Sequence, residues 1–316
     1  MNQLEPAIDA YGSYARASVM ADFLELWALH GIRRSWSDIA DYIEDNGWNS
    51  KVHETFVERI DAGGEESEDA DLGADGEEAV DRVYAQIEAR QAYLGSAYPF
   101  SFDAATGIVE VVDLTPSPYL ALLALTVAHA YSVQVEHIRP HEVFEDTVVR
   151  ALTEAGHRSV NFARIRASSS GFREALLEAG RQLSLRASPD GTYASKWAQD
   201  EGADAIVHID SGFSTDGAVG AWILVGQATC GKSNTWRQKM GEVQDRDWEI
   251  RLDTLAPPMA FLAVPHHAEV GHLNKLVGGS RRLVLDRLRL ATMLRSVSDK
   301  EQSLLTRVKD TEIMSP

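Results

Sequence analysis

Two apolar stretches, GADAIVHI at residues 202–209 and WILVGQAT at residues 222–229, decide the fold of the C-terminal half. Both are rich in β-branched and large apolar side chains, which favours buried β-strands. Turn-forming residues at 211–217 separate them, so we predict a hairpin. Asp204 stands near the start of the first stretch and Gln227 near the end of the second. Because residues that face each other in a hairpin are neighbours, these two polar side chains are predicted to lie side by side.

The segments around this hairpin alternate between helical and extended patterns. Their order of helix, strand, hairpin, helix, strand and helix predicts an α/β fold, with a mixed sheet flanked by helices. The predicted elements are a helix at 141–155, a strand at 160–162, a helix at 171–186, hairpin strands at 203–209 and 219–227, a helix beginning at 233–240, a strand at 259–264 and a final helix at 281–294.

The N-terminal half is predicted to be mostly helical. We place a domain boundary near Arg139 and Pro140, with an interaction or regulatory domain at 1–139 and a second domain at 140–316. The first two helices also fit a DNA-reading helix-turn-helix, although two packed helices are the simpler interpretation. The predicted elements are a helix at 14–30, a helix after an N-cap at Ser35, an acidic loop at 61–78 followed by a helix, a strand at 108–112 and a buried helix at 118–130.

Composition indicates a globular chain with room for two domains: 316 residues, 44% hydrophobic and 25% charged. A single cysteine excludes an internal disulfide, and the N-terminus lacks the basic and apolar regions of a signal peptide. The longest apolar run, 119–131, is shorter than the roughly 20 residues that cross a bilayer. We therefore expect a soluble cytoplasmic protein without a membrane partner.

The net charge of −18 is uneven, because residues 61–80 hold nine acids and no Lys or Arg. An acidic chain is a poor passive nucleic-acid coat, since phosphate binding needs a positive field. Basic residues nevertheless gather near 157–166, 181–186 and 281–289, so a local nucleic-acid surface is compatible with the sequence.

The polar residues at the strand ends suit phosphodiester hydrolysis. Carboxylate and amide oxygens are hard ligands of the kind that Mg²⁺ binds. The metal acidifies a water molecule and neutralises phosphate charge, and a nearby lysine orients the water or stabilises negative charge. The glycine turn and predicted helix after the hairpin, GKSNTWRQK at residues 231–239, supply Lys232 and Lys239 for that role.

Four short motifs resemble the PD-(D/E)XK nuclease superfamily, and within it restriction-endonuclease-like bacterial proteins of the phage-defence type. The resemblance covers about residues 140–295, and the order and spacing of the motifs carry it more than any single motif. In chain order the motifs are Phe144-Glu145, Gly202-x-Asp204, Gly226-Gln227 followed by Gly231, and Trp236-x-x-Lys239.

The resemblance implies a Mg²⁺ or Mn²⁺ site. Asp204 is then the metal-binding acid, Gln227 stands at the position of the second acid, and Glu145 is an additional acid near the metal. Glu174, on the next predicted helix, is the rival for that third place.

The catalytic lysine departs from the family pattern. The pattern places it at position 229, where this chain has Thr229. In some members a neighbouring element supplies the lysine, so Lys239 is the first choice here and Lys232 the second.

The implied activity is that of a metal-dependent endonuclease that hydrolyses phosphodiester bonds of DNA, with RNA as the alternative substrate. The implied setting is an effector subunit of a bacterial restriction or defence system. Nucleic acid, a partner protein or ATPase subunit, and a second copy of the chain are the expected partners. The N-terminal half, with its acidic loop, is then a docking or regulatory module.

Two other functions stay open. Gly226, Gly231, Lys232 and Ser233 match the phosphate-binding string G-x-x-x-x-G-K-S between a strand and a helix, which is typical of a P-loop NTP-binding protein. No strand with a terminal acid follows as a partner for it. The departure at Thr229 instead fits a catalytically degenerate nuclease fold that serves as a scaffold subunit.

Three weaker signals favour structural roles. His266, His267 and His272 lack the regular spacing of a zinc site. The only cysteine, Cys230, has no histidine partner pattern that would make it a nucleophile. Two tryptophans, Trp236 and Trp248, are predicted to be core anchors rather than base-stacking platforms. 

Overall fold

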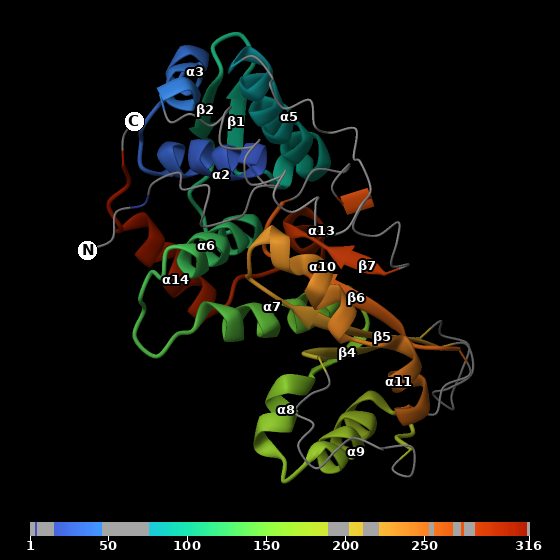
Figure 1. The fold of residues 1–316 in the computed structure, drawn as a ribbon. Helices are drawn as coiled ribbons and strands as arrows, with labels where there is room; N and C mark the ends of the chain where they lie inside the picture. Colours follow the sequence, from blue (N-terminus) through green and yellow to red (C-terminus); the bar gives the residue numbers. More distant parts are fainter. Residues whose placement is uncertain are drawn as a thin grey trace.

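A computed structural model describes residues 4, 16–45, 76–188, 202–210, 221–252, 256–267, 273–274 and 282–314. Figure 1 shows the helices and strands of these segments. In the N-terminal half they are α2 (Arg16–Leu29), α3 (Trp36–Asp45), α5 (Gly76–Leu94), the 3₁₀ turn η3 (Gly95–Ala97), β1 (Phe100–Asp103), β2 (Ile108–Val111) and α6 (Pro118–Ala130). In the C-terminal half they are α7 (Pro140–Glu154), β3 (Arg158–Asn161), α8 (Phe162–Ser168), α9 (Phe172–Leu183), β4 (Ala205–Asp210), β5 (Ala221–Ala228), α10 (Ser233–Glu242), α11 (Asp245–Arg251), β6 (Met259–Ala263), β7 (Leu283–Leu285), α13 (Arg287–Met293) and α14 (Asp299–Lys309).

The C-terminal half contains a five-stranded mixed sheet in the order β3-β4-β5-β6-β7. Strand β4 runs antiparallel to both of its neighbours, whereas β5, β6 and β7 are parallel. The hairpin predicted from the sequence is therefore confirmed as β4 and β5, and the register pairs Ala205 with Gly226.

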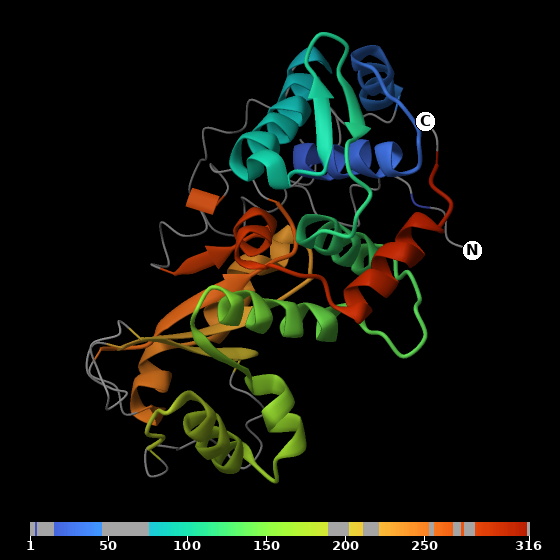
Figure 2. The same ribbon diagram turned by 180° about the vertical axis from the view of Figure 1, so that it is seen from behind.

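Helices cover both faces of this sheet because its strands alternate their apolar side chains. Val207, Leu224 and Phe261 face the large core that also contains residues of α7 and the N-terminal helices. Ile206 and Val225 face the opposite core, which is filled from α8, α9 and α11. Seen from both sides, α8, α9 and α11 lie at one end of the molecule and α2, α3 and α5 at the other (Figures 1 and 2).

The two halves of the chain share the large core. Phe23 of α2 and Leu122 of α6 belong to the same hydrophobic cluster as Phe261 of β6 and Leu285 of β7. The boundary predicted near Arg139 falls in the connection before α7, and the division into two domains stays a prediction.

A buried network of charges also joins the halves. Arg287 of α13 donates to both carboxylate oxygens of Asp22 on α2, at 2.6 and 2.7 Å. Arg90 of α5 lies 2.8 Å from Asp22 and 2.9 Å from Glu25. The hydroxyl of Tyr119 donates to Glu25 at 2.7 Å. All five side chains are buried, so the two positive and two negative charges must compensate one another.

Several boundaries agree with the sequence-based predictions. The buried helix α6 spans the predicted residues 118–130, and helix α10 begins at Ser233 as predicted. Before α3, the amide of Ser35 donates to Asp38 at 2.7 Å, which confirms the predicted cap.

Other elements differ from the predictions, for local reasons. Phe162 begins helix α8 rather than continuing a strand, because the side chain of Asn161 accepts from the amide of Arg164 and caps that helix. Residues 281–294 are not one helix: the described part contains strand β7, and then α13 begins after its cap, Asp286. Helix α14 follows, although the sequence analysis ended with the previous helix.

The N-terminal half is less purely helical than predicted. Strand β1 was not predicted, and it pairs with β2 to form an antiparallel hairpin. The acidic segment predicted as a loop at 61–78 lies outside the described residues up to position 75, and its last three residues begin helix α5. The turn predicted at 211–217 also lies outside them.

The two helices that fitted a DNA-reading motif pack into the core. Helix α2 is buried along most of its length, and α3 buries Ile39 and Ile43. The sequence of α3, WSDIADYIED, carries acids and no basic residue, which disfavours contact with phosphates. Within the segments that the structure describes, no helix combines the length and the apolar character that crossing a membrane requires.

Candidate functional site

The hairpin brings Asp204 to the end of β5. The amide of Asp204 donates to the carbonyl of Gly226 at 2.9 Å, one step beyond the last register pair. In return, the amide of Ala228 donates to the carboxylate of Asp204 at 2.8 Å. Asp204 therefore contacts the residues on either side of Gln227 in the chain, while the direct contact predicted between the Asp204 and Gln227 side chains stays a prediction.

Glu145 approaches the same place from helix α7. Burial raises the pKa of Glu145 to about 7, and the charges of Asp204 and then Asp146 add to the rise. The charge of Glu145 in turn contributes to a raised pKa of the Cys230 thiol, after burial as the main cause. Glu145 therefore lies within electrostatic range of both Asp204 and the loop after β5. Without a cation, the carboxylates of Glu145 and Asp204 repel each other.

Gln227 is buried near the end of β5, with 5% of its surface exposed, and its side chain contacts helix α10. Its amide nitrogen Nε2 donates to Oε2 of Glu242 at 2.7 Å. Its amide oxygen Oε1 is buried and has no hydrogen-bond partner within the described part of the chain. A buried acceptor of this kind costs about 1–3 kcal/mol unless a ligand binds to it.

Of the two candidate lysines, the structure links Lys239 to this group. Its ammonium binds the same Oε2 atom of Glu242 at 2.8 Å, so Glu242 joins Lys239 to Gln227. Lys232 is exposed and precedes α10 as its N-cap.

Glu242 was missed by the sequence analysis. It ends helix α10 three residues after Lys239, a spacing that places acid and base side by side on a helix. That spacing was the available signal. Partial burial would raise the pKa of Glu242, but the hydrogen bonds from Lys239 and Gln227 and the charge of Lys239 outweigh it and hold the pKa below its usual value.

The glycine of the Gly-x-Asp motif has a steric role. Gly202 has a φ of +78°, and a Cβ atom there would lie 2.8 Å from the carbonyl oxygen of Glu242. Only glycine accepts both this backbone conformation and this close approach. The motif therefore allows the end of α10 to pack against the segment that carries Asp204.

These groups suit a hard cation with few protein ligands. Among the described residues no cluster of three or more His, Cys, Asp or Glu is arranged to hold a metal. The candidate ligands are instead two carboxylates, Glu145 and Asp204, and the unpaired oxygen of Gln227. Mg²⁺ retains several water ligands and often takes only one or two carboxylates, so this set fits it.

The rival acid Glu174 lies at the start of helix α9. It is exposed, and its carboxylate accepts from the amide of Ser170 at 2.6 Å. Hydrogen bonds from Ser170 lower its pKa, and its negative charge in the first turn of α9 favours the start of that helix.

The segment that matched a phosphate-binding loop begins as a strand. Gly226, Gln227 and Ala228 pair with β6, and the Thr229 amide donates to Ala263 at 3.0 Å. The amide of Gly231 donates to the hydroxyl of Thr229, also at 3.0 Å. These amides are thus engaged within the protein, whereas a phosphate loop points its amides at the ligand.

The histidine pair and the cysteine belong to the core. A ring nitrogen of His266 lies 3.2 Å from the carbonyl of Cys230, and His267 accepts from Arg90 at 3.1 Å. Burial lowers the pKa of His266 to about 4, helped by the charge of Arg287. Because burial keeps the Cys230 thiol protonated, it is a poor nucleophile. The third histidine, His272, lies outside the described residues.

Both tryptophans singled out in the sequence are core residues, as predicted. Trp236 and Trp248 have no exposed surface. Trp236 packs beside His266 with ring centroids 5.5 Å apart, and Trp248 packs edge-on against Phe162 at 5.5 Å.

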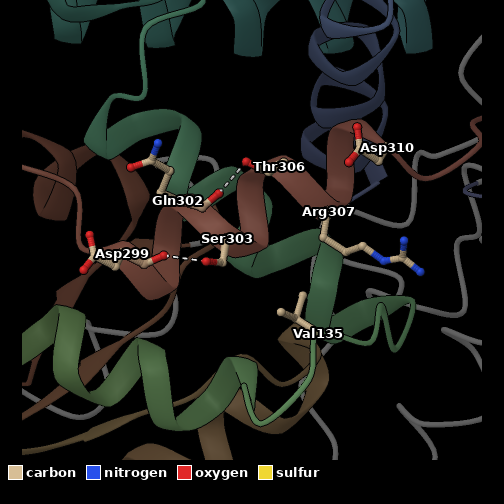
Figure 3. A pocket seen from close by; sticks show the side chains of 7 residues that line it. All are labelled: Val135, Asp299, Gln302, Ser303, Thr306, Arg307 and Asp310. Atoms are coloured by element: carbon tan, nitrogen blue, oxygen red, sulfur yellow. Dashed lines mark hydrogen bonds between the residues drawn. The ribbon is translucent and has the colours of Figure 1, made fainter.

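A surface hollow of about 550 Å³ lies elsewhere, between α14 and the loop at Val135 (Figure 3). The hydroxyls of Ser303 and Thr306 there donate to carbonyls of their own helix, those of Asp299 and Gln302. The hollow contains none of the residues predicted to act in a site, so it does not bear on the function.

Comparisons of the chain with protein-family models, with curated proteins and with solved structures found no match.

Proposed function

We propose that this chain is a metal-dependent nuclease that hydrolyses phosphodiester bonds of DNA with Mg²⁺ or Mn²⁺. One observation carries the proposal: the carboxylate of Asp204 lies at the end of β5, its charge helps to raise the pKa of Glu145, and the adjacent strand residue Gln227 has a buried amide oxygen without a partner among the described residues. A divalent cation would relieve the repulsion between the acids and bind the amide oxygen.

Each residue then has a defined task. Asp204 and Glu145 would hold the cation, with Gln227 as a neutral ligand, and the cation would supply an acidified water and charge neutralisation on the phosphate. Lys239, held near Gln227 through Glu242, would stabilise the negative charge that develops on the phosphate.

The architecture supports the finer fold assignment as part of the same proposal. A mixed sheet covered by helices on both faces is the arrangement that the restriction-endonuclease-like resemblance implied. The order α7, β3, α9, the β4–β5 hairpin, α10 and β6 follows the predicted order, with α8 added before α9 and α11 before β6. The effector role in a restriction or defence system follows from the resemblance alone.

The two alternatives have less support. A nucleotide triphosphate would have to displace backbone hydrogen bonds of Thr229 and Gly231 to bind the 226–233 segment. A catalytically degenerate scaffold is favoured by Thr229 at the usual position of the lysine. The ammonium of Lys239, which shares the Oε2 atom of Glu242 with Gln227, weakens that argument.

The test is cleavage of double-stranded DNA, single-stranded DNA and RNA by the full chain. With Mg²⁺ or Mn²⁺ we expect cleavage that EDTA abolishes and that renewed metal restores, and we expect none from the folded Asp204→Ala variant. Cleavage that survives both treatments rejects the proposal. The Lys232→Ala variant should cleave like the wild type, whereas nucleotide binding that this variant loses would support the P-loop alternative.

A further inference from the structure

The Oε2 atom of Glu242 accepts two hydrogen bonds from groups of the proposed site. Gln227 donates to it from β5 at 2.7 Å, and Lys239 donates to it from α10 at 2.8 Å. The carboxylate is only partly exposed, at 32% of its side chain. An ion pair with this degree of burial and a second donor is better ordered than an isolated surface pair.

The chemistry of Glu242 fixes which way the amide of Gln227 points. An ionised carboxylate only accepts hydrogen bonds, so the atom that Gln227 presents to it must be the nitrogen. The amide oxygen is thereby turned to the other side, where it is buried and lacks a partner among the described residues. Without Glu242, the amide could rotate and present its nitrogen to the metal side.

The backbone of Glu242 is held as firmly as its side chain. Its carbonyl group packs against the Cα of Gly202, where any Cβ would come within 2.8 Å. Gly202 lies two residues before Asp204, so Glu242 contacts the segment before β4 that carries the acid as well as Gln227 of β5, which carries the amide.

We propose that Glu242 is a positioning residue of the metal site, which orients the amide oxygen of Gln227 toward the cation and holds the ammonium of Lys239 beside it. This inference rests on the proposed function. Glu242 is not assigned as a ligand of the cation, because its Oε2 atom already accepts hydrogen bonds from Gln227 and Lys239. Residues of this kind, behind the direct ligands, typically change metal affinity or activity by about 10–100-fold when they are replaced.

The first experiment measures Mn²⁺ binding to the full chain by calorimetry, without any substrate. The Glu242→Gln variant has a side chain of the same size that both donates and accepts, so it no longer dictates the orientation of Gln227. We expect its Mn²⁺ affinity to fall by about 10–100-fold. The Glu242→Asp variant keeps the charge on a shorter side chain and should recover part of the affinity; it also serves if Glu242→Gln does not fold.

The chain offers a matched control. Glu178 on α9 forms an ion pair of the same i,i+3 spacing with Arg181, and its side chain is 34% exposed, close to the value for Glu242. It also accepts from an amide side chain, that of Gln182, at 2.7 Å. Glu178→Gln should leave the Mn²⁺ affinity unchanged. An equal loss of affinity in both variants would mean that any such pair matters for folding, and the inference would be wrong.

The second experiment is a double-mutant cycle on the cleavage rate at saturating Mn²⁺. If Glu242 acts there through Lys239, then Glu242→Gln added to Lys239→Met should lower kcat by no more than about 2-fold beyond Lys239→Met alone. If the loss of kcat in the double variant equals the product of the losses in the two single variants, Glu242 acts independently of Lys239, and this part of the inference is overturned.

The two experiments separate this inference from the nuclease proposal. A wild-type chain that binds Mn²⁺ but cleaves no nucleic acid overturns the nuclease proposal, while weaker binding by Glu242→Gln still supports the positioning role. Cleavage by the wild type supports the nuclease proposal, and an unchanged Mn²⁺ affinity in Glu242→Gln at the same time overturns the positioning role. A wild-type chain that binds no Mn²⁺ overturns both.

Discussion

The carboxylate of Asp204, the residue before β4, accepts a hydrogen bond at 2.8 Å from the backbone amide of Ala228, the last residue of β5. One side chain therefore closes the end of the hairpin and also presents negative charge to Glu145. These two roles are separable by substitution, because an amide side chain keeps the first and loses the second.

Asp204→Asn should abolish metal-dependent cleavage while preserving the fold. The oxygen of Asn still accepts from Ala228, so the free energy of unfolding should stay within about 0.5 kcal/mol of the wild type. Asp204→Ala leaves that amide unpaired and should cost about 1–2 kcal/mol more. Cleavage should fall by about 10³-fold or more in both, since the charge that holds the metal is gone. Urea unfolding and a cleavage assay on the same samples check this.

A nearby acid provides the control for that pair of variants. Asp146 follows Glu145 on α7, but its carboxylate is already bound by Asn161 and Arg164. Asp146→Asn should retain most of the cleavage activity. A loss as large as that of Asp204→Asn would show that general acidity near α7, rather than a specific ligand, supports the reaction.

Glu145 should make stability and metal binding depend on pH. Its pKa is raised from the ordinary 4.5 to about 7, so the folded state holds its proton more tightly than the unfolded state. The stability that this proton contributes is complete below pH 4.5 and is lost as the pH rises through 7. Glu145→Gln should therefore be more stable than the wild type at pH 8, by about 1–2 kcal/mol after allowance for solvent screening. Urea unfolding at pH 5 and pH 8 measures the difference.

The same titration predicts the pH dependence of metal binding. A cation binds Glu145 only after the proton leaves, so the Mn²⁺ affinity of the wild type should rise between pH 6 and pH 8, and the rise should be smaller in Glu145→Gln. Glu249→Gln, at an exposed position on α11, is the control for both measurements. Identical pH profiles for the wild type and Glu145→Gln would contradict the assignment of Glu145 to the site.

The hairpin and its polar ends were predictable because the signals are local. Apolar runs specify β4 and β5, and the pairing of neighbouring strands brings Asp204 to the 226–228 segment. Glu242 was missed because its link to Gln227 depends on where α10 docks, which no local pattern states. The Asp22–Arg287 pair, 265 residues apart in the chain, lies equally beyond local patterns.

Short elements failed for a different reason. Strand β7 has three residues and lies in a stretch with helical spacing, so its pairing with β6 overrides the local preference. The alternating pattern predicted that Phe162 belongs to a strand, but Asn161 caps helix α8, so Phe162 is the first residue of that helix. Helix caps and strand pairing decide the structure of such short segments, and hydrophobic periodicity alone carries no information about either.

Gly202→Ala should damage the site through α10. The new methyl group would lie 2.8 Å from the backbone of Glu242, at a φ of +78° that alanine rarely adopts. We expect a loss of about 1–3 kcal/mol in the free energy of unfolding and weaker Mn²⁺ binding. Gly241→Ala is the control one residue away from Glu242, because its methyl group would meet nothing within 4 Å and alanine favours a helix. If both variants bind Mn²⁺ like the wild type, contact between α10 and the Asp204 segment does not support the site.

Asp22→Asn should destabilise the contact between the two halves of the chain and loosen the loop beside the site. Asp22 compensates Arg287 and Arg90 in a buried setting, so removing its charge leaves an excess positive charge and should cost about 3–5 kcal/mol. Arg287 also donates to the carbonyl of Pro265 at 2.8 Å, and the next residue, His266, contacts the carbonyl of Cys230. Hydrogen exchange should therefore accelerate at residues 228–231 as well as in α2.

An exposed ion pair is the control for this prediction. Arg139 and Glu142 lie 3.0 Å apart, with side chains 72% and 51% exposed, so Glu142→Gln should change stability by less than about 1 kcal/mol. Faster exchange in α2 alone, with residues 228–231 unchanged in Asp22→Asn, would show that the buried network stabilises the N-terminal helices without reaching the site. Faster exchange in both places would make the N-terminal half a physical support of the metal site, because the network connects α2 to the loop that follows β5 through Arg287, Pro265 and His266.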